Sequence, residues 1–422
     1  MRVLWFTNSP CNYGKGNIYN GGGWMTALQD GITNPIFSVG EKIELGISFV
    51  MNGQQERVEQ GEVTYYPVPL AVKTKKNKFL DAIHPNDVHR DEVLWPHYIS
   101  HFKRVIDDFQ PDVIEIFGSE LYMGLASFAT DKPCVLHIQG LLSLSVNIFL
   151  PPGVSRMKYI FKDGLMKAWG NWQFLNYWNR SVYREKTILK NVNHFIGRTD
   201  CDRLAISILN RQAQYHYGGE LLRADFYDKQ KRKIPHKLTI VSIISLPLYK
   251  GYDLLLKIAN ILKSEVKIDF EWKVYGNVDP KLAESLTNIK HEQVNVKLCG
   301  VASAAQLKEA ILNSTVYVHP SYTENSPNSI CEAQILGVPV VATNVGGTNS
   351  LIEEGKSGLL FPATDPYIGA AHILRLYRNM EANITIGNNA RTIALLRHDK
   401  RTIVNQLIQT YKEVIQNDRK TV

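Results

Sequence analysis

Short apolar runs that alternate with helical patterns constrain the fold of this chain most strongly. Each run ends at a turn or glycine residue, as at Arg2–Thr7, Cys134–Ile138 and His194–Gly197 in the first half. The pattern restarts at Leu238 and includes Val316–His319. Such alternation predicts parallel strands joined by crossover helices. Two similar halves predict an α/β fold of two doubly wound domains that face a central cleft.

A polar, irregular segment between the two halves sets the expected domain limits. Residues 1–210 are expected to form the N-terminal domain, and residues 211–236, which include Gly218-Gly219, the linker. Residues 237–395 are expected to form the second domain. The last helical pattern extends past the expected end of the sheet. We therefore predict that residues 396–422 form a C-terminal helix that crosses back to the N-terminal domain.

Composition indicates a globular protein. The chain has 422 residues, 44% of them apolar, and no segment reaches the roughly 18 uninterrupted apolar residues of a membrane-spanning helix. The short apolar run before Thr7 cannot serve as a secretory signal. The five cysteines are scattered and form no Cys-x-x-Cys pair. These features predict a reduced, cytoplasmic protein without structural zinc.

The chain carries a net charge of +8, which fits an anionic partner. A basic and aromatic segment, from Val154 to Lys190, holds part of this excess, and Leu165, Trp169 and Trp172 recur there at helical spacing. One interpretation is a helix whose aromatic face packs on the domain and whose basic face is solvated. The other is an element that contacts a lipid surface or an acceptor. Because no nucleic-acid module is recognisable, nucleic acid is not an expected partner.

Two glutamates bracket a Ser-Pro-Asn-Ser turn that follows the strand Val316–His319. The second, Glu332, interrupts an apolar run, although burying a carboxylate costs roughly several kcal/mol unless it is paired or hydrogen-bonded. Ser326 is expected to cap a helix at this turn, with Pro327 in its first turn. Free N–H groups at such a helix start suit a phosphate or a sugar hydroxyl. Glu324 and Glu332 are therefore predicted to share one ligand site, where a carboxylate can accept two hydrogen bonds from a vicinal diol.

The block EN-SPNSIC-E followed by AQILGVPVVATNVGG resembles the Glu-x7-Glu block of glycosyltransferase family 4, which comprises retaining enzymes of the GT-B fold. The resemblance continues in Tyr249-Lys250-Gly251, Gly276 and Gly300-Val301. It is strongest over about residues 238–365 and looser over the first 210. It implies two Rossmann-like domains, of which the first binds the acceptor and the second binds the nucleotide-sugar donor.

The resemblance also implies roles for residues of the second domain. Glu332 would hold the ribose hydroxyls, Glu324 would contact the transferred sugar, and Lys250 would bind the diphosphate. Further donor-binding residues implied by the match are Asn325, Ser326, Asn328, Ser329, Gly276 and Val301.

This chain departs from the family at one position of the diphosphate site. The family often has an arginine five or six residues before the lysine, where this chain has Ser245 and Ile244. Diphosphate neutralisation is then expected to depend on Lys250 and backbone amides, or on another cation. Arg198 and Arg223 are candidates for that cation.

Two features of the N-terminal domain match the family more loosely. Gly22 and Gly23 resemble its glycine loop, where the backbone must approach the diphosphate closely; a plain surface loop is the alternative. His137, at a strand end, matches a histidine that contacts the donor sugar, although a structural histidine is the alternative. Glu115, on a neighbouring strand, is an acceptor-side candidate.

The implied reaction is front-face transfer, in which the departing phosphate helps to deprotonate the acceptor. Glu324, Lys250 and His137 are the residues expected at the reacting centre. The expected co-substrate is a UDP- or GDP-sugar, with no cofactor and no metal. The expected acceptor is a glycan or lipid-linked oligosaccharide of surface polysaccharide assembly, handled at the inner face of the membrane by a peripheral, cytoplasmic enzyme.

Other functions stay open at this point. Asp200-Cys201-Asp202 is a literal Asp-x-Asp motif, as in metal-dependent GT-A enzymes, but Thr199-Asp200 also reads as a helix cap. A sugar-nucleotide epimerase or a phosphorylase would share the fold. A non-catalytic nucleotide-sugar-binding subunit is a further alternative, which the missing arginine supports. A Walker-type NTPase is excluded, because Gly14-Lys15-Gly16 lacks the required spacing.

Overall fold

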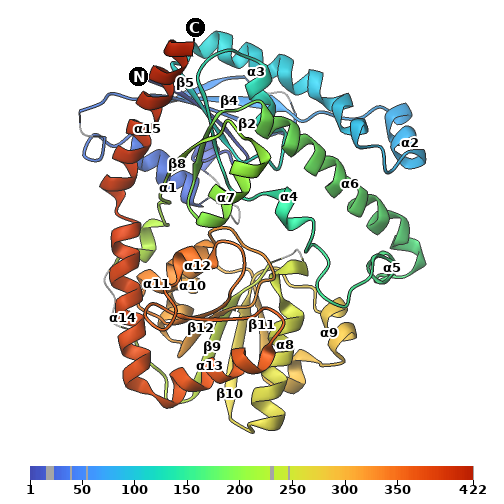
Figure 1. Cartoon of the computed structure of the whole chain (residues 1–422), viewed down its shortest axis with the longest axis vertical. Helices are drawn as coiled ribbons and strands as arrows, with labels where there is room; N and C mark the ends of the chain where they lie inside the picture. Colours follow the sequence, from blue (N-terminus) through green and yellow to red (C-terminus); the bar gives the residue numbers. More distant parts are fainter. Residues whose placement is uncertain (16–22, 39, 54–55, 229–231, 246–247, 422) are drawn as a thin grey trace. The chain divides into compact units, whose positions relative to one another are not determined.

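The computed structural model describes residues 1–15, 23–38, 40–53, 56–228, 232–245 and 248–421 (Figure 1). The chain divides into two compact units. Unit 1 comprises Met1–Val146, Trp169–Leu221 and His398–Val422, and unit 2 comprises Asn147–Ala168 and Leu222–Arg397. The last helix, α15 (Lys400–Thr421), thus groups with the first unit.

Unit 1 is built on an eight-stranded sheet in the order β3-β4-β2-β1-β5-β6-β7-β8. All neighbours pair in parallel except β3 and β4, which are antiparallel. The strands are β1 (Arg2–Thr7), β2 (Glu44–Met51), β3 (Val58–Gln60), β4 (Val63–Pro69), β5 (Val113–Phe117), β6 (Cys134–His137), β7 (His194–Gly197) and β8 (Gln214–Tyr217). The strand order reverses between β1 and β5, so this is a doubly wound sheet.

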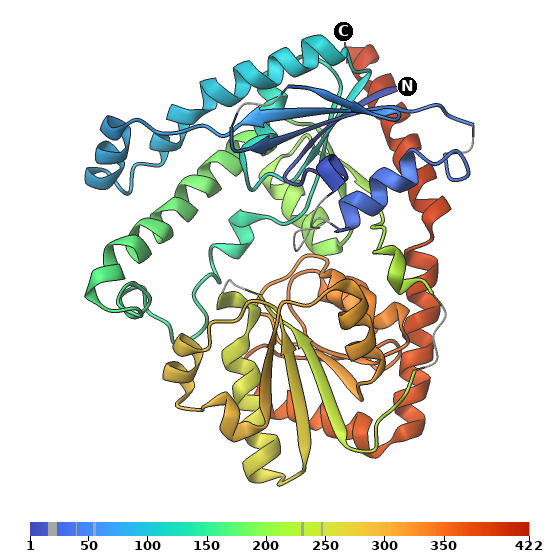
Figure 2. The ribbon, with the colours of Figure 1, turned by 180° about the vertical axis from the view of Figure 1, so that it is seen from behind.

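Helices cover both faces of this sheet. Helices α1 and α15 lie side by side on one face (Figure 2). Trp5, Leu28 and Tyr411 belong to the core that they share. Phe102 and Ile188 belong to the core of the other face. The helices of unit 1 are α1 (Gly23–Ile32), α2 (Lys75–Ile83), α3 (Trp95–Phe109), α4 (Leu142–Ser145), most of α6 (Leu165–Lys190), α7 (Asp200–Leu209) and α15, with the 3-10 segments η1 (Tyr13–Lys15), η2 (Val88–Leu94) and η3 (Tyr122–Phe128).

Unit 2 repeats the plan with a six-stranded parallel sheet in the order β11-β10-β9-β12-β13-β14. The strands are β9 (Leu238–Ile243), β10 (Phe270–Tyr275), β11 (Val296–Gly300), β12 (Val316–His319), β13 (Val340–Thr343) and β14 (Leu359–Phe361). The chain lays down β9, β10 and β11 in one direction and then returns to the other side of β9. The switch point therefore lies between β9 and β12, where ligands of such sheets bind.

The helices of unit 2 also form two layers. Leu255 of α8 and Ile373 of α13 belong to one core, and Ile311 of α10 and Ile330 of α11 belong to another. The helices are α5 (Arg156–Ile160), α8 (Tyr252–Asn260), α9 (Lys281–Thr287), α10 (Ala304–Leu312), α11 (Asn328–Ile335), α12 (Thr348–Leu351), α13 (Pro366–Arg378) and α14 (Met380–Arg397), and a π-helical turn (Ile261–Glu265) extends α8. In the described ranges, no helix combines the length and the apolarity needed to cross a bilayer.

The two doubly wound sheets confirm the predicted α/β class. Strand β11 begins at Val296, because Val294 ends a 3-10 turn (His291–Val294). Strands β2 and β4 were not among the predicted elements.

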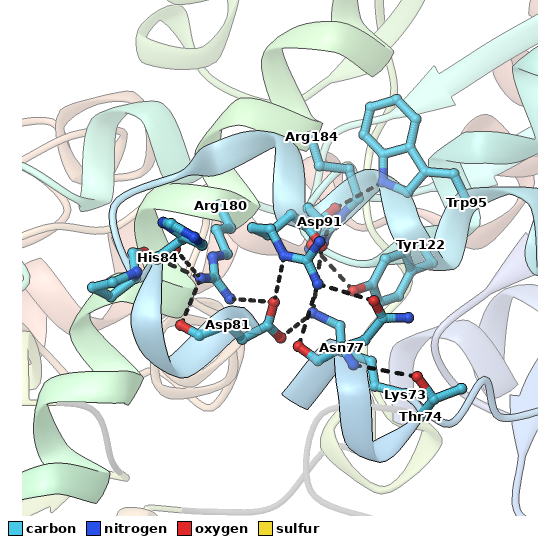
Figure 3. A network of polar contacts seen from close by, with 12 residues as sticks. Lys73, Thr74, Asn77, Asp81, His84, Asp91, Trp95, Tyr122, Arg180 and Arg184 are labelled. Carbon is cyan, nitrogen blue, oxygen red and sulfur yellow. Dashed lines mark hydrogen bonds and ion pairs between the residues drawn. The ribbon is translucent and has the colours of Figure 1, made fainter. Parts of the chain in front are cut away.

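The predicted helix in the basic, aromatic segment is present as α6, but its faces are not as the first interpretation had them. Arg180 and Arg184 are buried, whereas Trp169 and Phe174 are exposed. That interpretation, with the aromatic side packed and the basic side solvated, is therefore wrong at these positions. A buried arginine needs a partner, and Figure 3 shows that acidic groups from α2 and η2 supply it.

Two aspartates hold these arginines. Arg184 donates to both carboxylate oxygens of Asp91, at 2.7 and 2.8 Å. Arg180 lies 3.5 Å from Asp81, which also pairs with Lys73 at 2.7 Å and Arg90 at 3.1 Å (Figure 3). Part of the net positive charge of the chain is thus fixed inside unit 1 and does not face a partner.

Candidate donor site at the strand switch point

The side chains of Lys250 and Glu324 meet at the switch point of unit 2. Lys250 ends the 3-10 turn η5 (Leu248–Lys250) after β9, and Glu324 follows β12. Since β9 and β12 are parallel neighbours, both residues leave the sheet at the same edge. Lys250 Nζ lies 2.6 Å from Glu324 Oε1. The structure therefore brings together two of the residues predicted from the motifs.

Glycine lets the loops at this edge approach so closely. Gly251 has a φ of +75°, and a Cβ there would lie 1.8 Å from the carbonyl oxygen of Pro320. Gly276, a predicted donor-site residue, has a φ of +113°, and its Cβ would lie 2.0 Å from the carbonyl oxygen of Ile244. Any other residue would be strained at both positions. In this structure, both glycines are needed to hold backbone segments together at the edge.

Glu324 is an ionised carboxylate at the centre of a small network. Its Oε1 bonds Lys250, accepts from Ser321 Oγ at 2.8 Å, and lies 2.9 Å from His319 Nε2. Burial alone would raise the pKa of Glu324, but Lys250 and His319 outweigh it and hold that pKa well below its usual range. Burial likewise disfavours the Lys250 ammonium, yet Glu324 raises the pKa of Lys250. His319 and Ser321 had not been predicted as site residues, although each follows or ends a strand at this edge.

The buried carboxylate of Glu332 is paired with Arg223. It lies on α11, and its two carboxylate oxygens accept from Nε and Nη2 of Arg223, each at 2.8 Å. Burial raises the pKa of Glu332, and the two bonds from Arg223 partly offset that effect. Each carboxylate oxygen has a second lone pair, so a diol can still bond to it. The predicted ribose contact stays a prediction.

The helix that carries Glu332 begins one residue later than expected. Helix α11 starts at Asn328, and its N-cap is Pro327, with no side-chain cap. The prediction of Ser326 as the N-cap is wrong, because the Pro327 carbonyl already accepts from the N–H of Ile330 at 3.0 Å. Asn328 Oδ1 is buried and has no hydrogen-bond partner among the described atoms. The start of α11 therefore retains one hydrogen-bond acceptor without a partner among the described atoms, Asn328 Oδ1.

The remaining predicted donor residues of unit 2 differ in their exposure. Val301, which follows β11, is exposed. The half-buried residues at the turn are Asn325, Ser326, Asn328 and Ser329. Their contacts with a donor stay predictions.

In unit 1, His137 ends β6 at the corresponding edge of the sheet. Its Nδ1 lies 2.7 Å from Glu115 Oε1, and both side chains are buried. The other oxygen of Glu115 accepts from the Tyr411 hydroxyl of α15. Because Glu115 is fully buried and both of its oxygens are bonded, the structure argues against the predicted acceptor contact. Burial, opposed by Glu115, lowers the pKa of His137.

Of the predicted glycine loop, only Gly23 is described, as the first residue of α1. Gly22 lies outside the described residues. The next residue along, Trp24, lies edge-on to the His137 ring at 5.5 Å between centroids. The start of α1 therefore borders His137.

The two arginines considered as diphosphate cations already have carboxylate partners. Arg198 Nη1 lies 2.7 Å from Glu220 Oε2, and Arg223 pairs with Glu332. Neither assignment as the missing cation gains support from the structure.

The Asp-x-Asp motif is a helix cap. The side chain of Asp202 accepts from the backbone N–H of Arg198 and Thr199, and Thr199 Oγ1 accepts from Asp202 N in return. Tyr215 also donates to Asp202, at 2.5 Å. Asp202 is thus committed to structure, and the metal-binding reading of this motif is wrong.

The chain matches known proteins most clearly over unit 2. The family described as "Glycosyl transferases group 1" matches residues 224–393, which hold Lys250, Glu324 and Glu332. The chain carries a group 1 glycosyltransferase domain. It is also 27% identical over 224 residues to a D-inositol 3-phosphate glycosyltransferase of Paenarthrobacter aurescens, covering 47% of this chain and 54% of that protein. It is 30% identical over 156 residues to the amylovoran biosynthesis glycosyltransferase AmsK of Erwinia amylovora, covering 35% of this chain and 38% of that protein.

Solved structures match over nearly the whole chain. A sucrose-phosphate synthase from Thermosynechococcus elongatus has a TM-score of 0.70 at 15% identity, with 99% of each chain covered. Anabaena HepE, solved in complex with UDP and glucose, has a TM-score of 0.62 at 16% identity, with 97% of this chain and 99% of that chain covered. These likenesses show the fold, which is the GT-B class with two Rossmann-like units.

Proposed function

We propose that this chain is a retaining glycosyltransferase that moves a sugar from a UDP- or GDP-sugar to a lipid-linked glycan in surface polysaccharide biosynthesis. The observation that carries the proposal is the Lys250–Glu324 pair at the strand switch point of a group 1 glycosyltransferase domain. The Lys250 ammonium donates a hydrogen bond to the ionised Glu324 carboxylate, near the start of α11.

The cation acts on the leaving group. Breaking the anomeric C–O bond places negative charge on the departing diphosphate, and a preorganised ammonium and free helix N–H groups stabilise such charge. Lys250 and the start of α11 supply these donors in unit 2. When the diphosphate binds, it shares the Lys250 ammonium with Glu324.

The two glutamates bind hydroxyl groups. Glu324 is held ionised by Lys250 and His319, so it accepts hydrogen bonds from the transferred sugar. Glu332 is held in one orientation by the two bonds from Arg223, and its remaining lone pairs face a ribose diol. His137 is the proposed substrate contact of unit 1.

Relatives support the choice of donor and pathway. HepE is described with UDP and glucose, and AmsK is named for amylovoran biosynthesis. The matched segment covers 54% of the first relative and 38% of AmsK, so the activity of the whole chain is proposed here. We also propose metal-independent transfer, because Lys250 and helix N–H groups provide the positive charge; EDTA should leave the rate unchanged.

A basic, apolar strip of unit 2 supports contact with a membrane surface at the cytoplasmic face. Met157, Leu165 and Met166 are exposed, the last by 98%, and Lys158 and Lys167 are exposed among them. Exposed apolar side chains interleaved with lysines suit the headgroup region of an anionic bilayer. Such contact would bring the enzyme to a lipid-linked acceptor.

A thermal-shift screen against UDP-, GDP- and ADP-sugars tests the proposal. Ligand at 100 times its Kd stabilises the folded state by about 2.7 kcal/mol, so one class of nucleotide sugar should raise the melting temperature. Release of the nucleoside diphosphate in the presence of a membrane-lipid extract then tests turnover. Binding without transfer or slow donor hydrolysis would favour the non-catalytic alternative, and no binding at all would overturn the proposal.

A further inference from the structure

A buried polar chain in unit 1 connects the C-terminal helix to His137. Trp5 Nε1 donates to the Tyr411 hydroxyl at 3.0 Å, and Tyr411 donates to Glu115 Oε2. Glu115 Oε1 then bonds His137 Nδ1 at 2.7 Å. The four side chains come from β1, α15, β5 and the end of β6. A carboxylate at this depth destabilises the fold unless its bonds are complete, and here both oxygens are bonded.

The direction of the bonds sets the protonation of the imidazole. Glu115 accepts from Tyr411 at one oxygen. We assign its other oxygen as the acceptor from His137, which places the proton on Nδ1. Burial lowers the pKa of His137, with Glu115 opposing, so the ring is neutral and Nε2 carries a lone pair. In the described part of the chain, Nε2 is buried and has no hydrogen-bond partner.

Two aromatic side chains pack on the imidazole and restrict the plane of its ring. Phe117 stacks on it at 5.3 Å between centroids, and Trp24 packs on its edge at 5.5 Å. Arg198 lies over the Trp24 ring at 4.8 Å and is another charged group near His137. The free lone pair therefore has a fixed direction at the strand edge.

We propose that Tyr411 and Glu115 are positioning residues that hold His137 in the Nδ1–H tautomer, so that its Nε2 accepts a hydrogen bond from a hydroxyl group of the substrate. This inference rests on the proposed function. It deepens that function in one respect: the group opposite His137 must be a hydroxyl donor, and a carboxylate or a carbonyl oxygen there is rejected. It also assigns the C-terminal helix a part in substrate selection.

The tautomer can be measured without any activity. In ¹⁵N-histidine-labelled protein, long-range ¹H–¹⁵N spectra separate the two neutral tautomers, and His137→Asn identifies the signal. We expect the Nδ1–H form in the wild type. Glu115→Gln, which can donate to Nδ1, should shift His137 toward the Nε2–H form. A wild-type spectrum of the Nε2–H or the doubly protonated form would overturn the inference.

Steady-state kinetics test whether the orientation of His137 affects turnover. With whichever nucleotide sugar the wild type uses, Glu115→Gln and Tyr411→Phe should lower kcat/KM by roughly ten- to a hundredfold. Glu115→Gln replaces the Nε2 acceptor with an N–H, and Tyr411→Phe removes the bond that holds one oxygen of Glu115. Leu407→Ala is the control, because it removes packing in the same core without touching the polar chain; it should lower the melting temperature and leave kcat/KM unchanged.

Two results separate the possible failures. If Glu115→Gln shifts the tautomer but keeps wild-type kcat/KM, the positioning role is refuted while the transferase function stands. If the wild type transfers no sugar from any donor, the proposed function fails, and the tautomer spectra still decide whether Glu115 and Tyr411 orient His137.

Discussion

Replacing Lys250 with methionine removes the cation of the donor site and leaves Glu324 without its ion-pair partner. The Glu324 side chain is 8% exposed and that of Lys250 is 26% exposed. At 2.6 Å the attraction between the two charges is about 6 kcal/mol for an effective dielectric constant near 20, before desolvation is subtracted. Breaking a buried pair on one side costs about 3–5 kcal/mol.

Two features reduce this cost. Lys250 is partly solvated, and Ser321 and His319 still bond Glu324. We therefore expect Lys250→Met to lose about 2–3 kcal/mol of unfolding free energy, or about 4–12 °C in Tm at the usual 2–4 °C per kcal/mol for a unit of this size. Loss of the leaving-group donor should also lower kcat by about a hundred- to a thousandfold.

A double variant separates stability from catalysis. In Lys250→Met/Glu324→Gln the uncompensated carboxylate is gone, so most of the lost stability should return while turnover stays low. Differential scanning calorimetry and steady-state kinetics on the wild type, both single variants and the double variant measure the coupling. Additive melting shifts would show that the two side chains do not interact, and near-normal turnover in the double variant would refute their assignment to the donor site.

Three further predictions concern other positions. Arg223→Met should destabilise by about 3–5 kcal/mol because Glu332 is left buried without a partner, and Arg223→Met/Glu332→Gln should recover part of this in urea unfolding while donor KM stays raised. Burial and the nearby Glu185 raise the pKa of Glu120 from its usual 4.5 to about 7. A carboxyl whose pKa is raised by folding contributes stability below the unfolded pKa that is lost as pH rises through the folded pKa. Glu120→Gln should therefore gain Tm over the wild type as pH rises from about 4.5 to about 7, and parallel Tm–pH curves over that range would contradict this. Met166→Glu should reduce co-sedimentation with phosphatidylglycerol vesicles but not with phosphatidylcholine vesicles. Ile208→Glu, at an exposed site of unit 1, should change neither. Equal loss in both variants would refute the membrane contact of the basic, apolar strip.

The parts of the site that the sequence predicted depend on local pattern. A strand end followed by Lys250, and another followed by Glu324, can be recognised from their own neighbourhoods. Parallel strands then place both residues at one edge. The Ser-Pro-Asn-Ser turn between the two glutamates also predicted the helix that carries Glu332.

The parts that it did not predict depend on contacts between distant segments. Arg223 pairs with a glutamate 109 residues away, and Tyr411 bonds a glutamate 296 residues away. Arg180 and Arg184 are buried only because Asp81 and Asp91 of a separate segment meet them. At the α11 start, local propensity favours Ser326 as the cap, yet the helix begins at Asn328; helix ends are set within one or two residues only.

The central proposal is that the switch point of unit 2 binds the diphosphate of a nucleotide sugar through Lys250. Calorimetric titration of UDP against uridine, and of GDP against guanosine, measures the contribution of the diphosphate directly. The wild type should bind one diphosphate at least tenfold more tightly than its nucleoside, and Lys250→Met/Glu324→Gln should lose that preference while it still binds the nucleoside. An unchanged preference in the double variant would contradict the claim.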